Sequence, residues 1–435
     1  MSRVPQSTAD LLAFAGGAHR LSGTVRSDAI RLLGDTLAIG AAAVGAPGEE
    51  AILDTARTFG QGAEARLWGT PERLPAASGA FVNAFRAHCL EWDGVHEPAV
   101  VHAMSVVTAA LGAVLDRRAA GGHPCDPEEA LIALAVGVDV ASGLGLSVDS
   151  PMRFFRPAVC GLMGAALAVA RIEGAPLDDA LGLAYSSAAG TMQAHVEGSV
   201  TLPFQIANAA RAAVTASDLA KSGFSAPKNP LEGPYGYYEL FESGALETYT
   251  RHLGDVWRIS ELSTKPFPSG RASHALIAGV QELGLTPNNL EALEIRVPPL
   301  VHRLISRPYR SDMAPSYARL CGQLLCALTI RDGLVDPRKF TPETFADPGL
   351  CDLAGKINIQ RDANSDPNAL SPQRISARLE DGAVELDIPH TLGSPDNPLT
   401  PAQTQAKIAL ARALAPPDAD VRIFENPLAY FTELQ

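Results

Sequence analysis

The sequence predicts a mainly α protein: a large all-helical domain with a smaller α+β unit inserted before the C-terminal segment. Residues 8–255 are rich in Ala, Gly and Leu, with apolar residues at helical spacing. From about residue 260, apolar and polar residues alternate, as in half-buried strands. With 46% hydrophobic and 19% charged residues, the chain of 435 residues can bury a large core. We expect a helical domain at 1–259, an α+β domain at 260–392 and a segment at 393–435 that returns to the helical domain.

The first 255 residues contain several candidate helices. Ser27 and Asp28 can cap a helix whose apolar face begins at Ile30. Asp126 opens another, with acidic residues in the first turn that complement the helix dipole. Further helices are expected at 105–115, 161–172 and 207–222. Their small residues allow close approach, so we expect these helices to be buried in a bundle.

The strands are expected in the α+β unit. Leu293–Val297 alternates apolar and charged residues. Asp381-Gly382 separates two further alternating runs, which is a strong hairpin signal. A proline-rich stretch at 395–401 precedes a final helical stretch that extends through Leu414.

The charge balance argues against two classes of partner. Lys and Arg number 35 against 48 Asp and Glu, a formal net charge of −13, and no lysine precedes Lys221. We therefore expect neither a nucleic acid partner nor a membrane partner. Apolar runs such as 131–138 are too short to span a bilayer, and the N-terminus does not look like a signal peptide. These features predict a cytoplasmic protein whose six scattered cysteines are buried free thiols.

The densest polar cluster extends from Asn83 to His102. We expect its first part to end one helix, which Gly94 and Pro98 then break, and His102 to open the next helix. A helix N-terminus disfavours imidazolium, so this histidine suits a neutral base that Asp93 could orient. Two other interpretations stay open. The histidines can be structural, or Asp93, His96 and His102 can hold a metal, although their spacing is not a usual zinc pattern.

A second cluster lies at 263–274. Two prolines stiffen the loop that presents Lys265, and His274 is expected to open a helix. With Arg271 between them, these side chains would form a carboxylate site at a helix N-terminus. The alternative is a solvated basic loop.

The remaining motifs carry less information. Gln193, His195 and Glu197 lie between Gly190 and Gly198, and we interpret this segment as a loop between buried helices. The sequence has no Walker A loop, no Gly-x-Gly-x-x-Gly between a strand and a helix, and no Gly-x-Ser-x-Gly. It therefore gives no support for a nucleotide cofactor or for serine-hydrolase chemistry.

At these clusters the chain resembles the MmgE/PrpD family. The first family signature is matched by Asn83, His88, Leu90, Asp93, His96 and His102. The lysine–proline–aromatic–proline signature is matched at 265–268, with His274 after it. Residues 207–223, 231–236 and 393–399 also resemble family segments, in the family's order. Each motif alone is weak, but four in order over nearly the whole chain are specific.

The resemblance implies a helical body built from both ends of the chain, an inserted α+β lid, and an active site between them. It also implies a homodimer that needs neither a metal nor an organic cofactor. Family chemistry removes a proton next to a carboxylate, and then loses water or CO2 or returns the proton on the other face. The expected catalytic residues are Asp93, His102, Lys265 and His274, and the expected substrate-binding residues are His96, Arg156 and Arg271.

The chain departs from the family pattern at several positions. Ala84 stands for a Gly, Gly94 for an Asp, Arg156 for a His, Leu202 for a Lys and Leu324 for a Tyr. Losing a lysine removes one cation for a substrate carboxylate, and gaining an arginine adds one elsewhere. These changes argue against assuming the family's usual substrates.

We predict an enzyme that deprotonates a carbon next to a carboxylate of a small carboxylate substrate. His102 would transfer the proton with Asp93 orienting it, and His274 would be a second acid or base. Lys265 and Arg156 would hold carboxylate oxygens and stabilise enolate charge. A dehydratase-type lyase and an isomerase or epimerase both stay open. The alternatives are a non-catalytic small-anion-binding protein on the same scaffold and a purely structural dimer.

Overall fold

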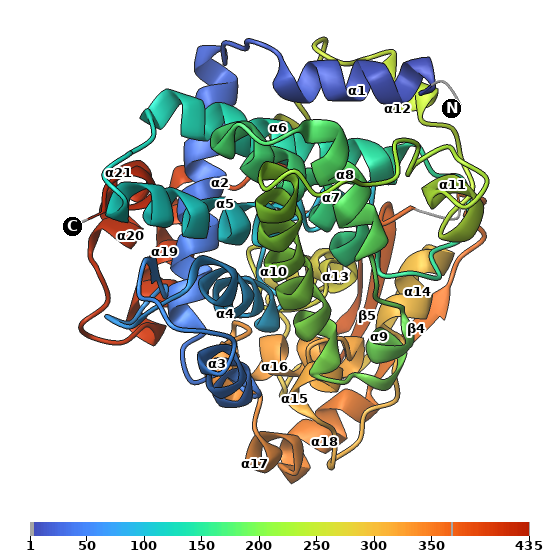
Figure 1. The fold of residues 1–435 in the computed structure, drawn as a ribbon. Helices are drawn as coiled ribbons and strands as arrows, with labels where there is room; N and C mark the ends of the chain where they lie inside the picture. Colours follow the sequence, from blue (N-terminus) through green and yellow to red (C-terminus); the bar gives the residue numbers. More distant parts are fainter. Residues whose placement is uncertain (1–3, 367–368, 435) are drawn as a thin grey trace.

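The computed structural model describes residues 4–366 and 369–434, and it confirms a mainly α protein (Figure 1). Helices account for most of the chain before residue 255, with only a two-stranded ribbon among them. The helices of this part are α1 (Gln6–Gly16), α2 (Gly23–Ala42), α3 (Glu49–Arg57), α4 (Ala76–Cys89), α5 (Ala103–Ala120), α6 (Pro127–Leu146), α7 (Arg156–Glu173), α8 (Leu177–Ser186), α9 (Gln193–Glu197), α10 (Thr201–Lys221), α11 (Tyr237–Leu240) and α12 (Glu247–Thr250). The ribbon consists of β1 (Ala65–Arg66) and β2 (Arg73–Leu74).

The capping residues predicted for two helices can be compared with the structure. Asp126 does cap α6, because its carboxylate accepts from the Glu128 and Glu129 amides. The prediction for α2 was wrong: the helix begins at Gly23, and the Ser22 hydroxyl accepts from the Val25 amide as its cap. Ser27 and Asp28 instead lie inside the first two turns.

Helices α5, α6, α7 and α10 form the centre of the bundle, and small residues let them approach closely. A Cβ placed on Gly164 of α7 would lie 2.2 Å from the Gly137 carbonyl oxygen of α6. Helix α6 has 20 residues and is long and apolar enough to cross a membrane. This corrects our expectation that no apolar stretch would be long enough to do so. However, 89% of its most apolar 18-residue window is buried inside the protein. It is therefore a core helix of this bundle.

A four-stranded sheet lies in the C-terminal part, in the order β4-β3-β5-β6. Strand β3 pairs parallel with β4, and the other pairs are antiparallel. The predicted hairpin is confirmed, but its turn lies one residue earlier, since Leu379 pairs with Gly382 across Glu380 and Asp381. The elements are η1 (Arg258–Glu261), η2 (Arg271–Ser273), α13 (His274–Glu282), β3 (Leu290–Val297), α14 (Pro299–Ile305), α15 (Pro315–Ala318), α16 (Gly322–Asp332), η3 (Pro337–Lys339), α17 (Pro342–Phe345), α18 (Pro348–Gly355), β4 (Ile357–Arg361), β5 (Gln373–Leu379) and β6 (Gly382–Ile388).

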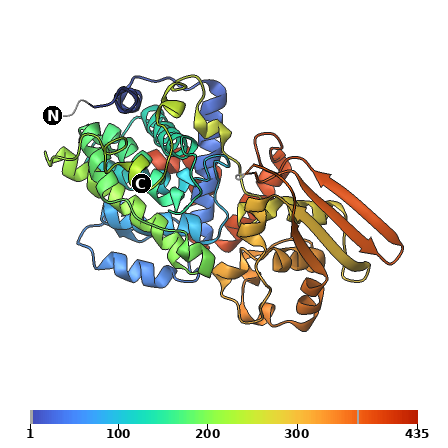
Figure 2. The same cartoon turned by 90° about the vertical axis from the view of Figure 1, so that its right-hand side faces the viewer.

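Most of the buried hydrophobic side chains fall into two large clusters. One combines residues from 11 to 262 with residues 423–431, and the other lies within 267–388. In Figure 2 the sheet and its helices lie beside the helical bundle. The boundaries at 259 and 392 stay a prediction.

The last segment packs against the bundle. It contains α19 (Pro401–Leu414), α20 (Arg422–Glu425) and α21 (Pro427–Thr432). Lys407 of α19 is almost fully buried, and its ammonium lies 2.6 Å from a carboxylate oxygen of Asp35 in α2. It also donates to the Trp92 carbonyl at 3.1 Å. These bonds fix the position of the loop that follows α4.

Candidate active site

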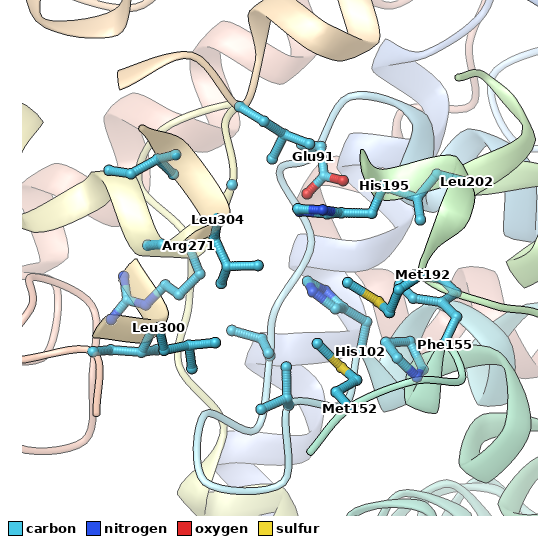
Figure 3. Close-up of a pocket in the computed structure, with 18 of the residues that line it drawn as sticks. Glu91, His102, Met152, Phe155, Met192, His195, Leu202, Arg271, Leu300 and Leu304 are labelled. Atoms are coloured by element: carbon cyan, nitrogen blue, oxygen red, sulfur yellow. The ribbon is translucent and has the colours of Figure 1, made fainter. Parts of the chain in front are cut away.

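A cavity lies where the two hydrophobic clusters meet. Figure 3 shows Glu91, His102 and His195 facing Arg271 and the leucines of α14 across it. Six of its twenty lining residues have polar side chains, namely His88, Glu91, Glu97, His102, His195 and Arg271. The remainder is apolar or glycine, so chemistry in this cavity depends on a small set of polar atoms.

Asp93 is the centre of the polar set and is fully buried. One of its carboxylate oxygens accepts from His88 Nδ1 at 2.9 Å, from His102 Nδ1 at 3.1 Å and from the Ser105 hydroxyl. The other oxygen lies 3.8 Å from the Lys265 ammonium. Since an ionised carboxylate only accepts, both imidazoles carry their proton on Nδ1. His102 therefore presents an unprotonated Nε2, which has no hydrogen-bond partner among the described residues.

The surroundings keep this histidine neutral. Burial lowers the pKa of His102, the Asp93 charge only partly offsets this, and the Lys265 charge lowers it further. Burial alone would raise the pKa of Asp93, but the positive charges that His102 and His88 carry at the low pH where Asp93 titrates, with their hydrogen bonds, hold it well below its usual range. His102 is also the residue that precedes α5, as predicted, where the helix dipole disfavours imidazolium. The pair is thus a neutral base on an ionised carboxylate.

Glu91 and Lys265 form a buried ion pair next to Asp93 and its two histidines. The Lys265 ammonium donates to the Glu91 carboxylate at 3.1 Å and to its carbonyl at 3.0 Å. Burial alone would raise the pKa of Glu91, but the charge of Lys265 and the charges that His88 and His102 carry at low pH lower it to about 2. Helix α4 stops at Cys89, before the Gly94 that was expected to break it, and Glu91 has φ of 54°. Such a conformation is strained for a residue with a side chain and persists when its surroundings hold it.

Lys265 does not lie in a solvated loop, because its side chain is 0% exposed. It stands behind Glu91 and neutralises that carboxylate, so it is not free to hold a substrate carboxylate while the pair is intact. The sequence prediction gave Lys265 this binding role because the sequence did not show that Glu91 would be its partner.

His195 is a second histidine in the cavity wall, and the sequence interpretation assigned it no function. Its Nδ1 accepts from the Arg307 guanidinium at 3.2 Å, and this guanidinium also donates to the His195 carbonyl. A neutral imidazole that accepts at Nδ1 has its proton on Nε2. Burial and the Arg307 charge lower the pKa of His195 to about 4. The cavity therefore holds two neutral histidines of opposite tautomer, a base and a donor.

Arg271 lines the opposite wall, where Glu97 neutralises it. Its guanidinium lies 2.7 Å from the Glu97 carboxylate and donates to the Leu392 carbonyl at 2.6 Å. His274 is buried behind it: Nδ1 accepts from Arg271 at 3.3 Å and Nε2 donates to the Ser269 carbonyl at 3.1 Å. Burial and the Arg271 charge hold the pKa of His274 well below its usual range. His274 thus positions Arg271 and does not line the cavity.

Two of the predicted substrate-binding residues lie outside the cavity wall. His96 is buried against Glu261, with Nε2 and the carboxylate 3.0 Å apart. Arg156 opens α7, but its guanidinium is bound to Glu242 at 2.7 Å and to the Ser150 carbonyl. Both groups are engaged in structural contacts, and the structure brings neither to the substrate space.

Of the positions at which the chain departs from the family pattern, one lines the cavity and another lies away from it. Leu202, which the resemblance matched to a family lysine, lines the cavity with an apolar side chain. Leu324 is fully buried in the second hydrophobic cluster and does not reach the cavity.

Among the described residues, one trio could hold a metal ion. His88, Asp93 and His102 offer ligand atoms that all lie within 4.8 Å of one another. This differs from the trio considered from the sequence, since His88 takes the place of His96. A metal on these atoms would displace the Nδ1 protons that now bind the carboxylate.

The six cysteines are all free thiols, as expected, although only three of them are fully buried: Cys160, Cys321 and Cys326. Burial raises the pKa of Cys160 to about 12, so this thiol is not a nucleophile at neutral pH.

The fold and the site together define a mainly helical protein whose apolar cavity carries an aspartate-bound imidazole base. The chain belongs to the MmgE/PrpD family: the MmgE/PrpD N-terminal domain matches residues 14–248, and the MmgE/PrpD C-terminal domain matches residues 267–425. This confirms the resemblance that the motifs indicated.

The chain is also similar to characterised relatives. It is 25% identical to the cis-aconitate decarboxylase of Mus musculus over 402 residues, covering 86% of this chain and 80% of the relative. It is 25% identical to the human enzyme of that name, with 74% and 69% covered, and 25% identical to the Aspergillus terreus enzyme, with 78% and 74% covered. These relatives support an enzyme with lyase-type activity.

Proposed function

We propose that this protein is a lyase or isomerase that removes a proton from the carbon next to a carboxylate of a small substrate. The observation that carries the proposal is the pair of opposite tautomers in one cavity, an unprotonated Nε2 on His102 and a protonated Nε2 on His195. A base and a hydrogen-bond donor are the two groups that enolate formation requires.

In the proposed step, His102 Nε2 takes the proton and becomes imidazolium. The electron pair of the broken C–H bond moves onto the substrate carboxylate, whose oxygen accepts a hydrogen bond from His195. Asp93 stabilises the imidazolium, since its carboxylate already binds Nδ1–H. The enolate then expels a leaving group from the neighbouring carbon, to which the His102 imidazolium returns the proton, or it takes a proton on its other face from His195 Nε2, the other donor in the cavity.

The proposal includes three features that the family resemblance supports: a homodimer, a cytoplasmic location, and catalysis without a metal or an organic cofactor. It also includes a lid role for the α+β unit, since part of the cavity wall comes from η2 and α14. Sedimentation of the purified protein tests the dimer, and activity after chelation tests the independence from metal.

Deuterium exchange tests the chemistry directly. The protein is incubated in D2O with a panel of small mono-, di- and tricarboxylates, and 1H NMR follows loss of the signal next to the carboxylate. We expect exchange with at least one compound, and a loss of about 100-fold or more in His102→Ala. His123→Ala, an exposed histidine, is the matched control and should exchange like wild type.

The contrary result is specific. If no carboxylate exchanges or is converted with the wild-type protein, or if His102→Ala exchanges at the wild-type rate, the proposed chemistry is wrong. Binding of a carboxylate that is recovered unlabelled and unchanged would favour the small-anion-binding protein instead.

A further inference from the structure

One buried arginine near the cavity has no charged partner. Arg319 is 3% exposed, its buried Nη1 has no hydrogen-bond partner, and it forms no ion pair with a carboxylate among the described residues. The Glu91 charge raises its pKa from a distance, but Lys265 already neutralises that carboxylate. Its guanidinium packs against the Phe340 ring, with 4.3 Å between the guanidinium carbon and the ring centroid. Buried charges in proteins are normally paired, so an unpaired guanidinium indicates a ligand that supplies the anion.

This arginine lines a small recess that shares four wall residues with the main cavity. The recess is lined by Arg319 together with Ser199 and Ser316. His88, Glu91, Leu202 and Leu320 line both the recess and the main cavity. A buried Nη1 atom of Arg319 has no hydrogen-bond partner in the described structure, and burial lowers the pKa of this group to about 10, so it is still charged at neutral pH.

The other cations around the cavity are already used. Lys265 is neutralised by Glu91, and Arg271 by Glu97. Arg307 also has no carboxylate partner and a buried Nη1 without a hydrogen bond, but its guanidinium binds His195 and lines neither space. Among the described residues, the substrate space therefore offers one cation without a carboxylate partner, which matches one carboxylate and not three.

The remaining wall is apolar. Met152, Phe155, Met192, Leu202, Leu300 and Leu304 surround the space beside the two histidines. A second or third carboxylate placed against these side chains would lose its hydration without gaining a partner, which is strongly unfavourable. A branched hydrocarbon group would instead be stabilised by the same surface.

We propose that the substrate of this site is a monocarboxylate with a branched or aromatic apolar body, whose carboxylate binds Arg319 while its apolar body fills the methionine- and leucine-lined wall. That the ligand is a substrate rests on the proposed function. The ligand class rests on the unpaired guanidinium and the apolar wall. It sets this chain apart from a site for a tricarboxylate such as the one its relatives are named for.

Calorimetry with three probes tests the ligand class: isocaproate, its neutral amide isocaproamide, and tricarballylate. We expect isocaproate to bind at least 10-fold more tightly than tricarballylate. Arg319→Gln should weaken isocaproate by about 10- to 100-fold, the range for a charge-assisted hydrogen bond, and should change isocaproamide by less than 3-fold. Arg319→Lys, which keeps the charge, should recover part of the loss.

A variant of the wall separates the two parts of the proposal. Leu304→Asn should weaken both isocaproate and its amide, because both bury the same hydrocarbon. Arg338→Gln removes an exposed arginine whose partner is Asp336, and it should leave all three affinities unchanged. Thermal unfolding of each variant identifies any that fail to fold, and Arg319→Lys then carries the test.

Two results would overturn the inference: tricarballylate binding as tightly as isocaproate, or an isocaproate affinity that is the same in wild type and in the folded Arg319 variants. These outcomes are distinct from failure of the proposed chemistry. Isocaproate that binds through Arg319 while no carboxylate exchanges deuterium would refute only the chemistry, and exchange with a tricarboxylate alone would refute only the ligand class.

Discussion

Replacing Asp93 with asparagine tests the role of its carboxylate in the site, because the change keeps the shape of the side chain and removes its charge. The carboxylate accepts three hydrogen bonds on one oxygen, from His88, His102 and Ser105. An amide can offer its NH2 to these nitrogens, and His102 would then shift its proton to Nε2. For a histidine base, the wrong tautomer lowers the rate by about 10⁴-fold, and we expect a loss of that order in Asp93→Asn.

The same substitution should destabilise the fold. Removing one partner of a buried charge pair costs about 3–5 kcal/mol, and the retained hydrogen bonds place Asp93→Asn near about 3 kcal/mol. The pKa of Asp93 is lowered by folding, so its contribution is present above pH 3.8 and is lost as the pH falls through its folded pKa. The pKa of His88 is raised by Asp93 and Glu91 against burial, so its contribution is present below pH 6.5 and is lost as the pH rises through its folded pKa. The loss should therefore be largest between about pH 4 and pH 6.5.

Two measurements check this. Urea unfolding at pH 6, followed by circular dichroism, gives the change in the free energy of unfolding. Long-range 1H–15N NMR reports the tautomer of His102 without a substrate. Asp312→Asn is the control, since that carboxylate is 83% exposed and should change neither quantity. An Asp93→Asn protein with the Nδ1–H tautomer, wild-type exchange and wild-type stability would refute the reasoning.

Three further predictions concern titration and packing. The pKa of His102 is lowered by burial, so activity should hold at pH 6.5 and fall only as the pH drops further through that lowered value; a rate already halved at pH 7 would contradict this. Gly164→Ala should cost about 1–3 kcal/mol in urea unfolding because its Cβ would lie 2.2 Å from a carbonyl oxygen of α6, whereas Gly355→Ala, with nothing within 4 Å, should be neutral or stabilising. Burial raises the pKa of Asp139 to about 6, so its ionisation removes stability as the pH rises through 6. Asp139→Asn, which can keep both hydrogen bonds, should therefore be more stable than wild type at pH 8 by on the order of 3 kcal/mol, and equal or lower stability there would count against that.

Periodicity and end signals were sufficient for much of the fold. The long helices of the bundle and the hairpin of the sheet could be predicted, because their apolar residues recur at one period over many positions. Boundaries were less predictable: Ser22 competes with Ser27 as a cap for α2, and only the packed structure decides between them. The end of α4 depends on the strained Glu91, which no local propensity would place there.

The site was predictable in its members but not in its pairings. The motif contains both Asp93 and His102, nine residues apart, and the structure joins them. The roles of the cationic side chains could not be predicted, because the sequence around a lysine or arginine does not show which carboxylate it will pair with. Lys265 meets Glu91, whereas Arg319, which no motif indicated, meets no carboxylate among the described residues. Such pairing depends on contacts between distant segments, which a single sequence does not contain.

The Lys407 contact has a consequence for the order in which the protein can be completed. It links residues 315 positions apart, from α19 to the loop carrying Glu91 and Asp93. During synthesis that loop emerges from the ribosome long before its supporting ammonium does. A nascent or proteolytically shortened chain lacking α19 leaves the Asp35 carboxylate and the Trp92 carbonyl without this donor, so the catalytic loop reaches its final geometry only after nearly the whole polypeptide has been made.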